Sequence, residues 1–485
     1  MQRGDSLPDF YGGLYLPEYE ESKELTDNKI EEITPRSVFI EESRVSLAVG
    51  EEAKISVQIG DEVKIGQPLS VGSNLLPLSF ASVSGTVRSI GTVGDSEQRF
   101  IEIENNRKNE KAELREDGFS SSPSSGKRDI WSYTREQLLL LMERTLLTGH
   151  GGAGFPAYKK YQTKKNIDCV LINICECEPY LTCDRALTVG AAQDVIEGAV
   201  LLSRAANSER IVVCIEDADL ITPLSKTVKA AFRDVKIQKA DEHSIIYRSG
   251  SEDFSSSRSR SASSPSQSWE IELLRVGGKY PSGSERQLIK AAVGREVPFG
   301  GLPADAGVLV SNAATAAAFR RSVNGGYPAV RRIVTVSGAI TKPKNLLVPE
   351  GTKIAELAAV CGEFTEPLRS GRKQAAIILG GPMTGEWATL DTPVPLSVGG
   401  VTVLPAIFGE EGACIRCGRC ERSCPAGIVP YQIDRADRAV LPHELLSLSA
   451  GACIACGLCS YVCPAHRRLT AHTLHAAKLA RRFAD

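Results

Sequence analysis

The chain lacks long apolar runs and any excess of charge of one sign, and each absence excludes a class of protein. The richest apolar stretches, 138–142 and 375–379, end at charged residues or glycine, so we expect no segment that spans a bilayer. The first ten residues hold no basic region followed by an apolar core, and we expect no secretory signal. With 57 Lys plus Arg against 59 Asp plus Glu, the net charge is −2, which argues against a nucleic-acid-binding protein.

Cysteine is abundant but concentrated: eight of the 14 cysteines lie in two short runs near the C-terminus, CIRCGRCERSCP and CIACGLCSYVCP. Disulfide frameworks belong to small secreted chains with dispersed cysteines, whereas clustered cysteines in a chain of 485 residues more often bind metal. Each run has the spacing C-x2-C-x2-C-x3-C-P of ferredoxin-type [4Fe-4S] proteins. Three thiolates at this interval can bind three corners of one cubane, and the fourth, before a proline, points to the other cluster.

This crossed arrangement predicts two ligand sets. The first consists of Cys414, Cys417, Cys420 and Cys463, and the second of Cys453, Cys456, Cys459 and Cys424. The alternative is two zinc sites, which are usually built from separated CxxC pairs. A third cysteine within three residues in both runs favours iron–sulfur clusters, which would conduct single electrons.

Composition and periodicity predict a multidomain α/β protein. Strand-like runs such as 169–174 alternate with helical stretches such as 190–205, which is typical of α/β domains. Two segments rich in charge and serine cannot bury a core. The predicted segments are an N-terminal arm (1–30), a β-rich domain (31–104), a linker (105–130), an α/β domain (131–330) with a disordered insertion (248–268), a small β-grasp-like domain (331–405), the cysteine region (406–470) with flanking helices, and a basic tail (471–485).

The β-rich domain resembles a known carrier fold. The phrases IGDEVKIGQPLSVG and SFASVSGTVRSIG resemble the flattened barrel, or barrel-sandwich, of biotinyl and lipoyl carrier domains. That family carries its cofactor on a lysine in the hairpin between the two phrases. No lysine occurs between Lys64 and Lys108, so we interpret the domain as a structural module without a covalent cofactor.

A glycine loop and two carboxylates mark a candidate nucleotide site. Residues 148–160 contain Gly149-x-Gly151-x-x-Gly154, which alone is weak evidence, but about twenty residues later an apolar strand ends in NICECEP. This places Glu176 and Glu178 at the carboxyl edge of a strand, where α/β domains bind ligands. Glycines let the backbone approach a phosphate closely. The alternative for the two glutamates is a solvated turn.

The phrases GHGGAGFPAYKK and INICECEPYLTCDRAL resemble the FMN- and NADH-binding subunit of respiratory complex I, and more closely the RnfC family of the Rnf electron-transport complex. The second resemblance covers nearly the whole chain, through GGLYLPEYEESK, KYPSGSERQLI, GREVPFGGLPADAGVLVSN, GGPMTG and both cysteine runs. It implies a Rossmann-like domain that binds FMN and NADH. It also implies that the β-grasp-like domain is of the SLBB type and that the last domain is a helical 2[4Fe-4S] ferredoxin domain.

The resemblance also implies roles for individual residues. The FMN phosphate and ribityl chain would contact Gly149, Gly151, Gly152, Gly154, Lys160, Asn173 and Asn312. The isoalloxazine would border Glu176, Tyr280, Gly283 and Glu285. NADH would meet Glu178 through its nicotinamide ribose, and Phe155 and Phe299 through its adenine.

The sequence departs from the family pattern at two places. Cys175 stands where complex I has an acidic residue, and Cys177 and Cys183 follow it. These thiols could bind a further metal, although we expect them to be buried side chains. The tail AHRRLTAHTLHAAKLARR replaces the usual apolar stretch, which leaves its docking open. We expect its histidines to be solvated: His466, His472 and His475.

The function implied is that of a peripheral subunit of the Rnf complex on the cytoplasmic face of the bacterial inner membrane. Electrons would pass between NADH and ferredoxin or flavodoxin through FMN and the two clusters, with integral membrane subunits as partners and no catalytic acid or base. One alternative is a soluble cobalamin reductase of bacterial microcompartments, and another is a non-catalytic electron-wiring scaffold. The opening GGLYLPEYEES and the β-rich domain favour the Rnf interpretation. The direction of electron flow cannot be read from the residues.

Overall fold

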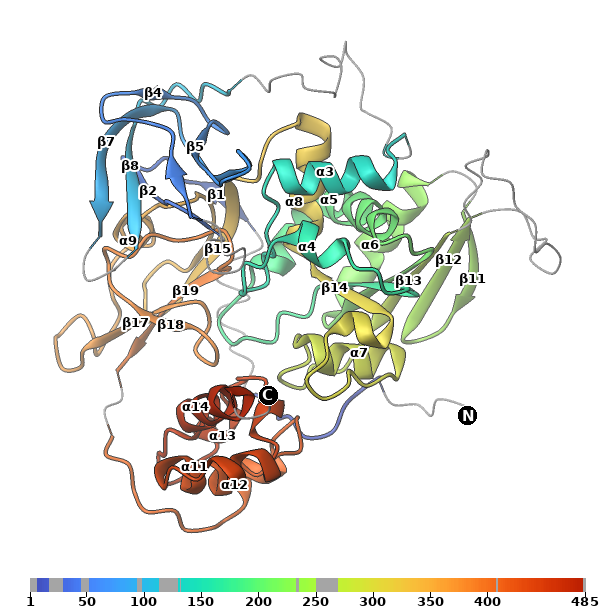
Figure 1. The fold of residues 1–485 in the computed structure, drawn as a ribbon, viewed down its shortest axis with the longest axis vertical. Coiled ribbons are helices and arrows are strands. Elements are labelled where there is room, and N and C mark those ends of the chain that lie inside the picture. The colour runs from blue at the N-terminus through green and yellow to red at the C-terminus, as the bar shows by residue number, and fades with distance from the viewer. Residues whose placement is uncertain are drawn as a thin grey trace.

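The computed structural model describes residues 7–16, 29–44, 52–93, 98–112, 130, 132–232, 235–249, 269–406 and 409–482. Residues 250–268 of the predicted insertion lie outside the described residues, as do most of the predicted linker and N-terminal arm. The described parts form an α/β domain, two neighbouring β domains and a separate helical domain (Figure 1).

The α/β domain is built on a six-stranded sheet in the order β11-β12-β13-β10-β9-β14. The strands are β9 (Cys169–Asn173), β10 (Arg210–Ile215), β11 (Lys236–Ala240), β12 (Ser244–Ser249), β13 (Trp269–Arg275) and β14 (Val308–Asn312). From β13 to β14 the neighbouring strands run parallel, and β11 and β12 add an antiparallel edge. The almost continuous apolar sequences CVLIN and RIVVCI fit β9 and β10, because both faces of a parallel sheet are covered.

Helices cover both faces of this sheet. They are α3 (Arg135–Arg144), α4 (Ala157–Tyr161), α5 (Cys183–Ala205), α6 (Ile221–Ala231), α7 (Glu285–Val293) and α8 (Ala313–Gly325), with short 3-10 turns η1 (Ala218–Leu220) and η2 (Pro303–Ala306). The larger core joins α3, α4, α5, α6 and α8 to one face, and a smaller core joins α7 to the other. Helices α5 and α8 touch closely, since a Cβ at Gly198 would lie 2.0 Å from the carbonyl oxygen of Ala316.

Helix α5 bears on the expectation that no segment spans a membrane. By length and composition this 23-residue helix could cross a bilayer, although its sequence has no long uninterrupted apolar run. However, 67% of its apolar window is buried inside the domain. Core helices of this length pass the same test, so the match is weak evidence for a span.

The first β domain pairs two small sheets, β2-β8-β7-β4 and β3-β5-β6. Its strands are β2 (Ser37–Glu41), β3 (Lys54–Ile55), β4 (Glu62–Val63), β5 (Pro68–Val71), β6 (Pro77–Phe80), β7 (Gly85–Thr92) and β8 (Arg99–Asn105). Alternation in β2 buries Val38 and Ile40 opposite Ile103 and Ile101 of β8. Together with Leu69, these side chains form the centre of a closed apolar core.

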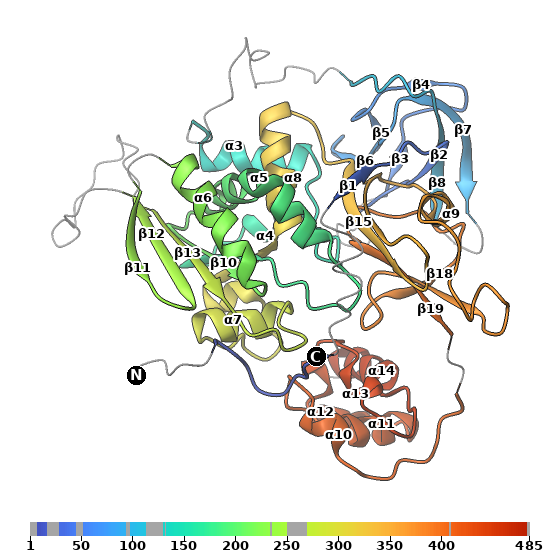
Figure 2. The same ribbon diagram turned by 180° about the vertical axis from the view of Figure 1, so that it is seen from behind.

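The second β domain has a six-stranded sheet in the order β1-β16-β15-β19-β17-β18, with one helix. Its elements are β1 (Ile30–Glu32), β15 (Arg331–Gly338), β16 (Lys344–Pro349), α9 (Ile354–Val360), β17 (Ala375–Leu379), β18 (Glu386–Ala388) and β19 (Gly400–Pro405). Strand β1 pairs in parallel with β16, although it lies at the predicted border of the N-terminal arm and the first β domain. A buried ion pair between Arg44 and Glu350 also joins the two β domains, which lie side by side (Figures 1 and 2).

The helical domain lies at the end of the molecule away from the first β domain (Figures 1 and 2). Its elements are α10 (Arg419–Arg422), α11 (Pro430–Arg438), α12 (Pro442–Ser447), the turn η3 (Ala450–Ala452), α13 (Leu458–Tyr461) and α14 (Leu469–Arg482). Gln287 of α7 donates from Nε2 to the carbonyl of Pro425 at 3.2 Å. The helical domain therefore contacts the α/β domain on its α7 side.

Candidate functional site

The glycine loop between α3 and α4 is closed on itself and fixed to α8. The amide of Gly149 donates to the carbonyl of Phe155 at 2.8 Å, and the amide of His150 donates to the Thr315 hydroxyl at 2.9 Å. Gly152 has a φ of +106°, and a Cβ built there would find nothing within 4 Å. The loop therefore has an open side that any side chain at this position would enter, on a backbone that favours glycine.

Two asparagines lie next to the loop at the carboxyl edge of the sheet. Asn173 ends β9 and Asn312 ends β14, and they are partners in register. Asn173 donates from Nδ2 to the carbonyl of Gly283 at 2.8 Å. A Cβ at Gly151 would lie 3.3 Å from the Cβ of Asn312, so the loop passes directly over this edge.

A cation completes the edge. Lys160 of α4 donates from Nζ to Glu285 of α7 at 2.6 Å and also to the carbonyl of Val310. The edge of the sheet thus brings together Gly151, Lys160, Asn173, Gly283, Glu285 and Asn312.

These residues fit a cofactor that carries a phosphate. Helix α8 begins directly after Asn312, whose side chain accepts from the amide of Ala314 at 2.8 Å. The positive end of a helix dipole, a lysine and an open glycine loop are the features that bind phosphate in α/β folds. The fit is to the phosphate end of a flavin mononucleotide.

Glu176 does not point freely into this edge. Its carboxylate accepts from the amides of Asp184 at 3.1 Å and Arg185 at 3.2 Å, in the first turn of α5. Burial and the neighbouring charge of Asp184 raise the pKa of Glu176. Its structural role is therefore to cap α5, which the sequence did not indicate.

Glu178 is held by the second β domain. It accepts from the amide of Met383 at 3.1 Å and from the hydroxyl of Thr384, both in the GGPMTG loop. Burial raises the pKa of this carboxyl. Because both glutamates accept backbone hydrogen bonds, the alternative of a solvated turn is wrong. The contact with a loop two hundred residues away has no local signal in the sequence.

The predicted aromatic residues lie at the surface. The side chains of Phe155 and Phe299 are 46% and 70% exposed, so each can accept a stacked ring. Phe299 also lies beside the helical domain, since its ring would be 3.4 Å from a Cβ at Gly451. The stacking role of both residues stays a prediction.

The three extra thiols serve different neighbours. Cys183 donates to Glu176 at 3.0 Å, the amide of Gly283 donates to the sulfur of Cys177 at 3.4 Å, and Cys175 is buried beneath β10. Among the described residues, no group of three or more His, Cys, Asp or Glu side chains is arranged to hold a single metal ion.

The first predicted ligand set surrounds one cavity in the helical domain. Cys414, Cys417, Cys420 and Cys463 all line it, together with Tyr431. The last cysteine of the second run therefore lies with the first three of the first run. The amides of Tyr431 and Glu421 lower the pKa of Cys420 against the larger opposing effect of its burial, as expected for donors aimed at a sulfur.

The second ligand set gathers around Cys424. Burial and the nearby charge of Cys424 both raise the pKa of Cys453, Cys456 and Cys459. The amide of Ala455 donates to the sulfur of Cys453 at 3.4 Å. Four thiols and amides directed at sulfur fit a [4Fe-4S] cluster, because such clusters are tuned by backbone hydrogen bonds.

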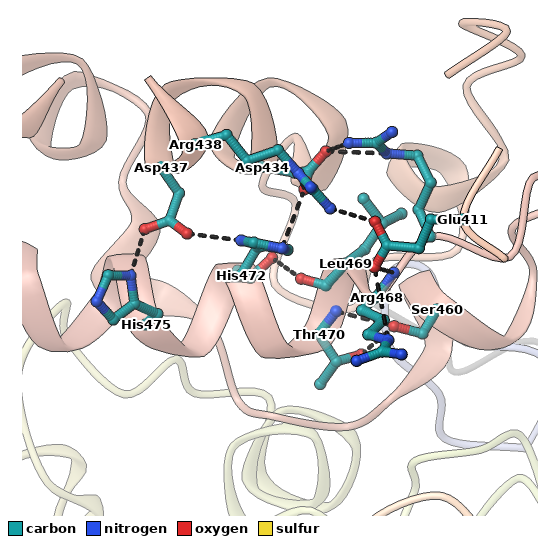
Figure 3. Close-up of polar contacts among 12 residues, drawn as sticks. Glu411, Asp434, Asp437, Arg438, Ser460, Arg468, Leu469, Thr470, His472 and His475 are labelled. Carbon is teal, nitrogen blue, oxygen red and sulfur yellow. Dashed lines mark hydrogen bonds and ion pairs between the residues drawn. The ribbon is translucent and has the colours of Figure 1, made fainter. Parts of the chain in front are cut away.

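Helix α14 docks through charged side chains (Figure 3). Asp437 of α11 contacts Nδ1 of His472 at 2.7 Å and Nδ1 of His475 at 2.6 Å. Thr470 reaches the sulfur of Cys459 at 3.4 Å. The expectation that His472 and His475 are only solvated is wrong, because a polar helix can dock through ion pairs where an apolar stretch is missing. The remaining predicted histidine, His466, donates its amide to the carbonyl of Cys463 at 3.1 Å.

Four family models match the chain. They are the RnfC barrel sandwich hybrid domain (8–107), the Nuo51 FMN-binding domain (142–321), the SLBB domain (333–386) and the 4Fe-4S dicluster domain (413–466). The predicted fold class, FMN and the [4Fe-4S] clusters are thereby confirmed.

Curated relatives extend the likeness to most of the chain, and each is the third-lettered (C) component of its complex. The component of the proton-translocating ferredoxin:NAD(+) oxidoreductase complex of Clostridium ljungdahlii is 32% identical over 441 residues, which cover 88% of this chain and 84% of that protein. The component of the ion-translocating oxidoreductase complex of Pectobacterium carotovorum is 30% identical over 88% of this chain, and that of Rhodobacter capsulatus is 33% identical over 59%. The chain spans 52% and 49% of the length of these last two relatives.

Proposed function

The chain belongs to the RnfC family of ion-translocating ferredoxin:NAD oxidoreductase (Rnf) complexes, and from this premise we propose that it passes electrons between NADH and ferredoxin through FMN and two [4Fe-4S] clusters. FMN, when bound, supplies the step between electron pairs and single electrons. The observation that carries the proposal is the convergence of the glycine loop, Lys160 and the two asparagines at one sheet edge.

The residues at this edge bind and orient. Lys160 and the start of α8 would hold the phosphate, and Gly152 leaves room for the backbone to approach it. Asn173 and Gly283 border the other side of the edge. Phe155 would close the site toward NADH with an exposed ring.

Contacts between the domains support a fixed order of the cysteine sets. Tyr280, on the flavin edge, donates from its hydroxyl to the carbonyl of Cys456 at 2.7 Å. A Cβ at Gly457 would lie 2.5 Å from the carbonyl oxygen of Met383, in the loop that binds Glu178. We therefore name Cys453, Cys456, Cys459 and Cys424 the inner set. We infer that it lies between the flavin edge and the remaining cysteines.

The other four cysteines, Cys414, Cys417, Cys420 and Cys463, form the outer set. Cys414 and Cys417 are exposed, and Ile415 between them is 67% exposed. An exposed apolar residue beside exposed ligands supports docking of another protein here. We propose that the outer set faces a further subunit of the complex at the cytoplasmic side of the cell membrane.

Purification from membranes tests the proposal. The chain, isolated anaerobically, should bring integral membrane subunits with it, release yellow flavin on denaturation, and reduce an artificial one-electron acceptor with NADH. Recovery as a soluble protein with flavin and clusters but without membrane partners would favour the cobalamin reductase alternative. Recovery without flavin would favour the wiring scaffold.

A further inference from the structure

A cavity of about 510 Å³ lies where the α/β domain meets both β domains. Its walls come from α8 and α5, from the start of β15, and from Ile65 and Lys111 of the first β domain. Gly152, Lys160, Asn173 and Glu285 do not line it, so it is separate from the flavin edge. Cavities of this size hold small organic ligands in other proteins.

The charges in this cavity are mostly positive. Lys111, Arg321, Arg331 and Arg332 line it, against the single carboxylate of Asp184. Arg321 is paired with Asp194 at 2.7 Å, and Arg331 is paired with Glu32. These two arginines therefore already have counter-charges outside the cavity.

The other two cations form no ion pair with any carboxylate in the described part of the chain. Arg332 is 6% exposed, and its hydrogen bonds run to the carbonyls of Leu396 at 2.9 Å and Ile333 at 3.2 Å. Lys111 lies over the ring of Tyr327, 5.4 Å from its centroid. A buried guanidinium without a directly bonded carboxylate is costly, so an anion from solution would be stabilised here.

Two further lining residues have unused polar atoms. The Nε2 atom of His150 and the hydroxyl of Ser322 are buried, and neither has a hydrogen-bond partner among the described residues. His150 is 2% exposed and Ser322 is 1% exposed. Burial and the charges of Arg332, Arg44 and Arg321 lower the pKa of His150, so its imidazole is neutral at pH 7. Buried polar groups of this kind normally have a partner, which a bound molecule can supply.

The remaining wall is apolar and low. Ala314, Ala317 and Ala318 face the cavity from α8, and Leu187, Ile333 and Leu347 contribute larger side chains. Three alanines on one helix face leave a shallow surface on which a flat group can lie. The chemistry of the walls thus combines a cationic end with a flat apolar side.

We propose that this cavity binds a small organic anion, with a carboxylate or phosphate at Arg332 and Lys111 and a flat apolar body against the alanines of α8. This site is additional to the proposed flavin and NADH sites. Its position gives it access to the flavin loop, because His150 belongs to that loop and its amide is bonded to Thr315 of α8.

Calorimetric titration of the full chain, with flavin and clusters bound, tests the proposal. Phenyl phosphate should bind at least about ten-fold more tightly than inorganic phosphate, which lacks the apolar body, or phenol, which lacks the charge. Benzoate distinguishes a carboxylate site from a phosphate site by its rank against phenyl phosphate. The proposal is overturned if neither aromatic anion binds, if neither binds more tightly than inorganic phosphate, or if binding displaces FMN.

Two variants locate the binding. Ala317→Leu should fill the cavity and weaken phenyl phosphate at least about ten-fold, because a packed interior has no room for both. Lys111→Gln should weaken it about three-fold by removing one exposed charge, while Lys108→Gln, three residues away and outside the cavity, should not. Flavin content and NADH-driven dye reduction, measured on each variant, separate a failure here from a failure of the proposed function. Equal affinities in the two lysine variants would rule out the cationic end at Lys111.

Discussion

The two cysteine sets share one spacing but have different surroundings. Outer-set residues Cys414 and Cys417 are exposed, whereas the inner set has a buried Cys424 and three partly buried thiols. The inner set also receives the hydroxyl of Tyr280 at the carbonyl of Cys456. Solvent exposure and hydrogen bonds tune the potentials of iron–sulfur clusters. Equal motifs can thus be given different redox properties by the domain against which they pack.

The largest expected effect concerns the assignment of Cys424 to the inner set. Cys424→Ala should remove about four of about eight irons, and the cluster lost should be that of the second run. Iron analysis and electron paramagnetic resonance of the reduced protein measure this. Cys361→Ala, at a buried cysteine outside both runs, is the control and should keep all the iron. Loss of the first-run cluster instead would disprove the crossed ligation.

The next expected effect separates the flavin edge from the clusters. Gly152→Val should empty the flavin site, because it adds methyl groups on the open side of the loop and strains a backbone at φ +106° by about 1–3 kcal/mol. The flavin released on denaturation is the measurement. Gly371→Val is a matched control, since Gly371 has a φ of +69° with nothing within 4 Å, but lies in the second β domain. If both variants keep flavin, the loop is not its cradle.

A smaller effect is expected at Glu178, between the flavin edge and the inner set. Glu178→Gln should raise the NADH concentration needed for half-maximal dye reduction about ten-fold, if a charge-assisted hydrogen bond to NADH is lost. Bound flavin and both clusters should persist. Thr384→Val removes only a loop partner of Glu178. The same rise in Thr384→Val would show that Glu178 positions the loop, and no rise in Glu178→Gln would exclude both roles.

The contact between the inner set and the flavin edge should have a modest effect. Tyr280→Phe removes the hydrogen bond to Cys456, worth about 0.5–1.5 kcal/mol, and should slow cluster reduction by NADH about three-fold in stopped-flow measurements. The rate of flavin reduction should not change. Tyr461→Phe, at a half-exposed ring of α13, is the control. An unchanged rate of cluster reduction in Tyr280→Phe would show that this contact does not limit the transfer.

The smallest effect is expected in the packing of α14 around the inner set. His475→Ala should lower the free energy of unfolding by less than about 1 kcal/mol, because the side chain is 62% exposed. His472→Ala should cost more, since its side chain is 27% exposed. Thermal denaturation followed by loss of cluster absorbance measures both. Equal stabilities in the wild type and both variants would show that the histidine contacts with Asp437 do not stabilise the helix.

Sequence alone predicted the parts of the protein whose geometry is local. The spacing of cysteines along a short run limits which cluster corners they can reach, and the spacing of glycines in the loop over 149–154 limits which backbone can approach a phosphate. The buried parallel strands β9 and β10 followed from their apolar runs. Each of these features depends on neighbours within about ten residues, so the residue pattern carries it.

Contacts between distant segments were decided only by the tertiary structure. The partners of Glu178 lie in the GGPMTG loop, the strand Ile30–Glu32 pairs with Lys344–Pro349, and α14 docks on α11 through Asp437. The arrangement of an inner and an outer cysteine set has the same origin, because two runs with one spacing are equivalent until a domain packs against one of them. Such contacts depend on how whole surfaces fit, and no periodicity along the chain records that fit.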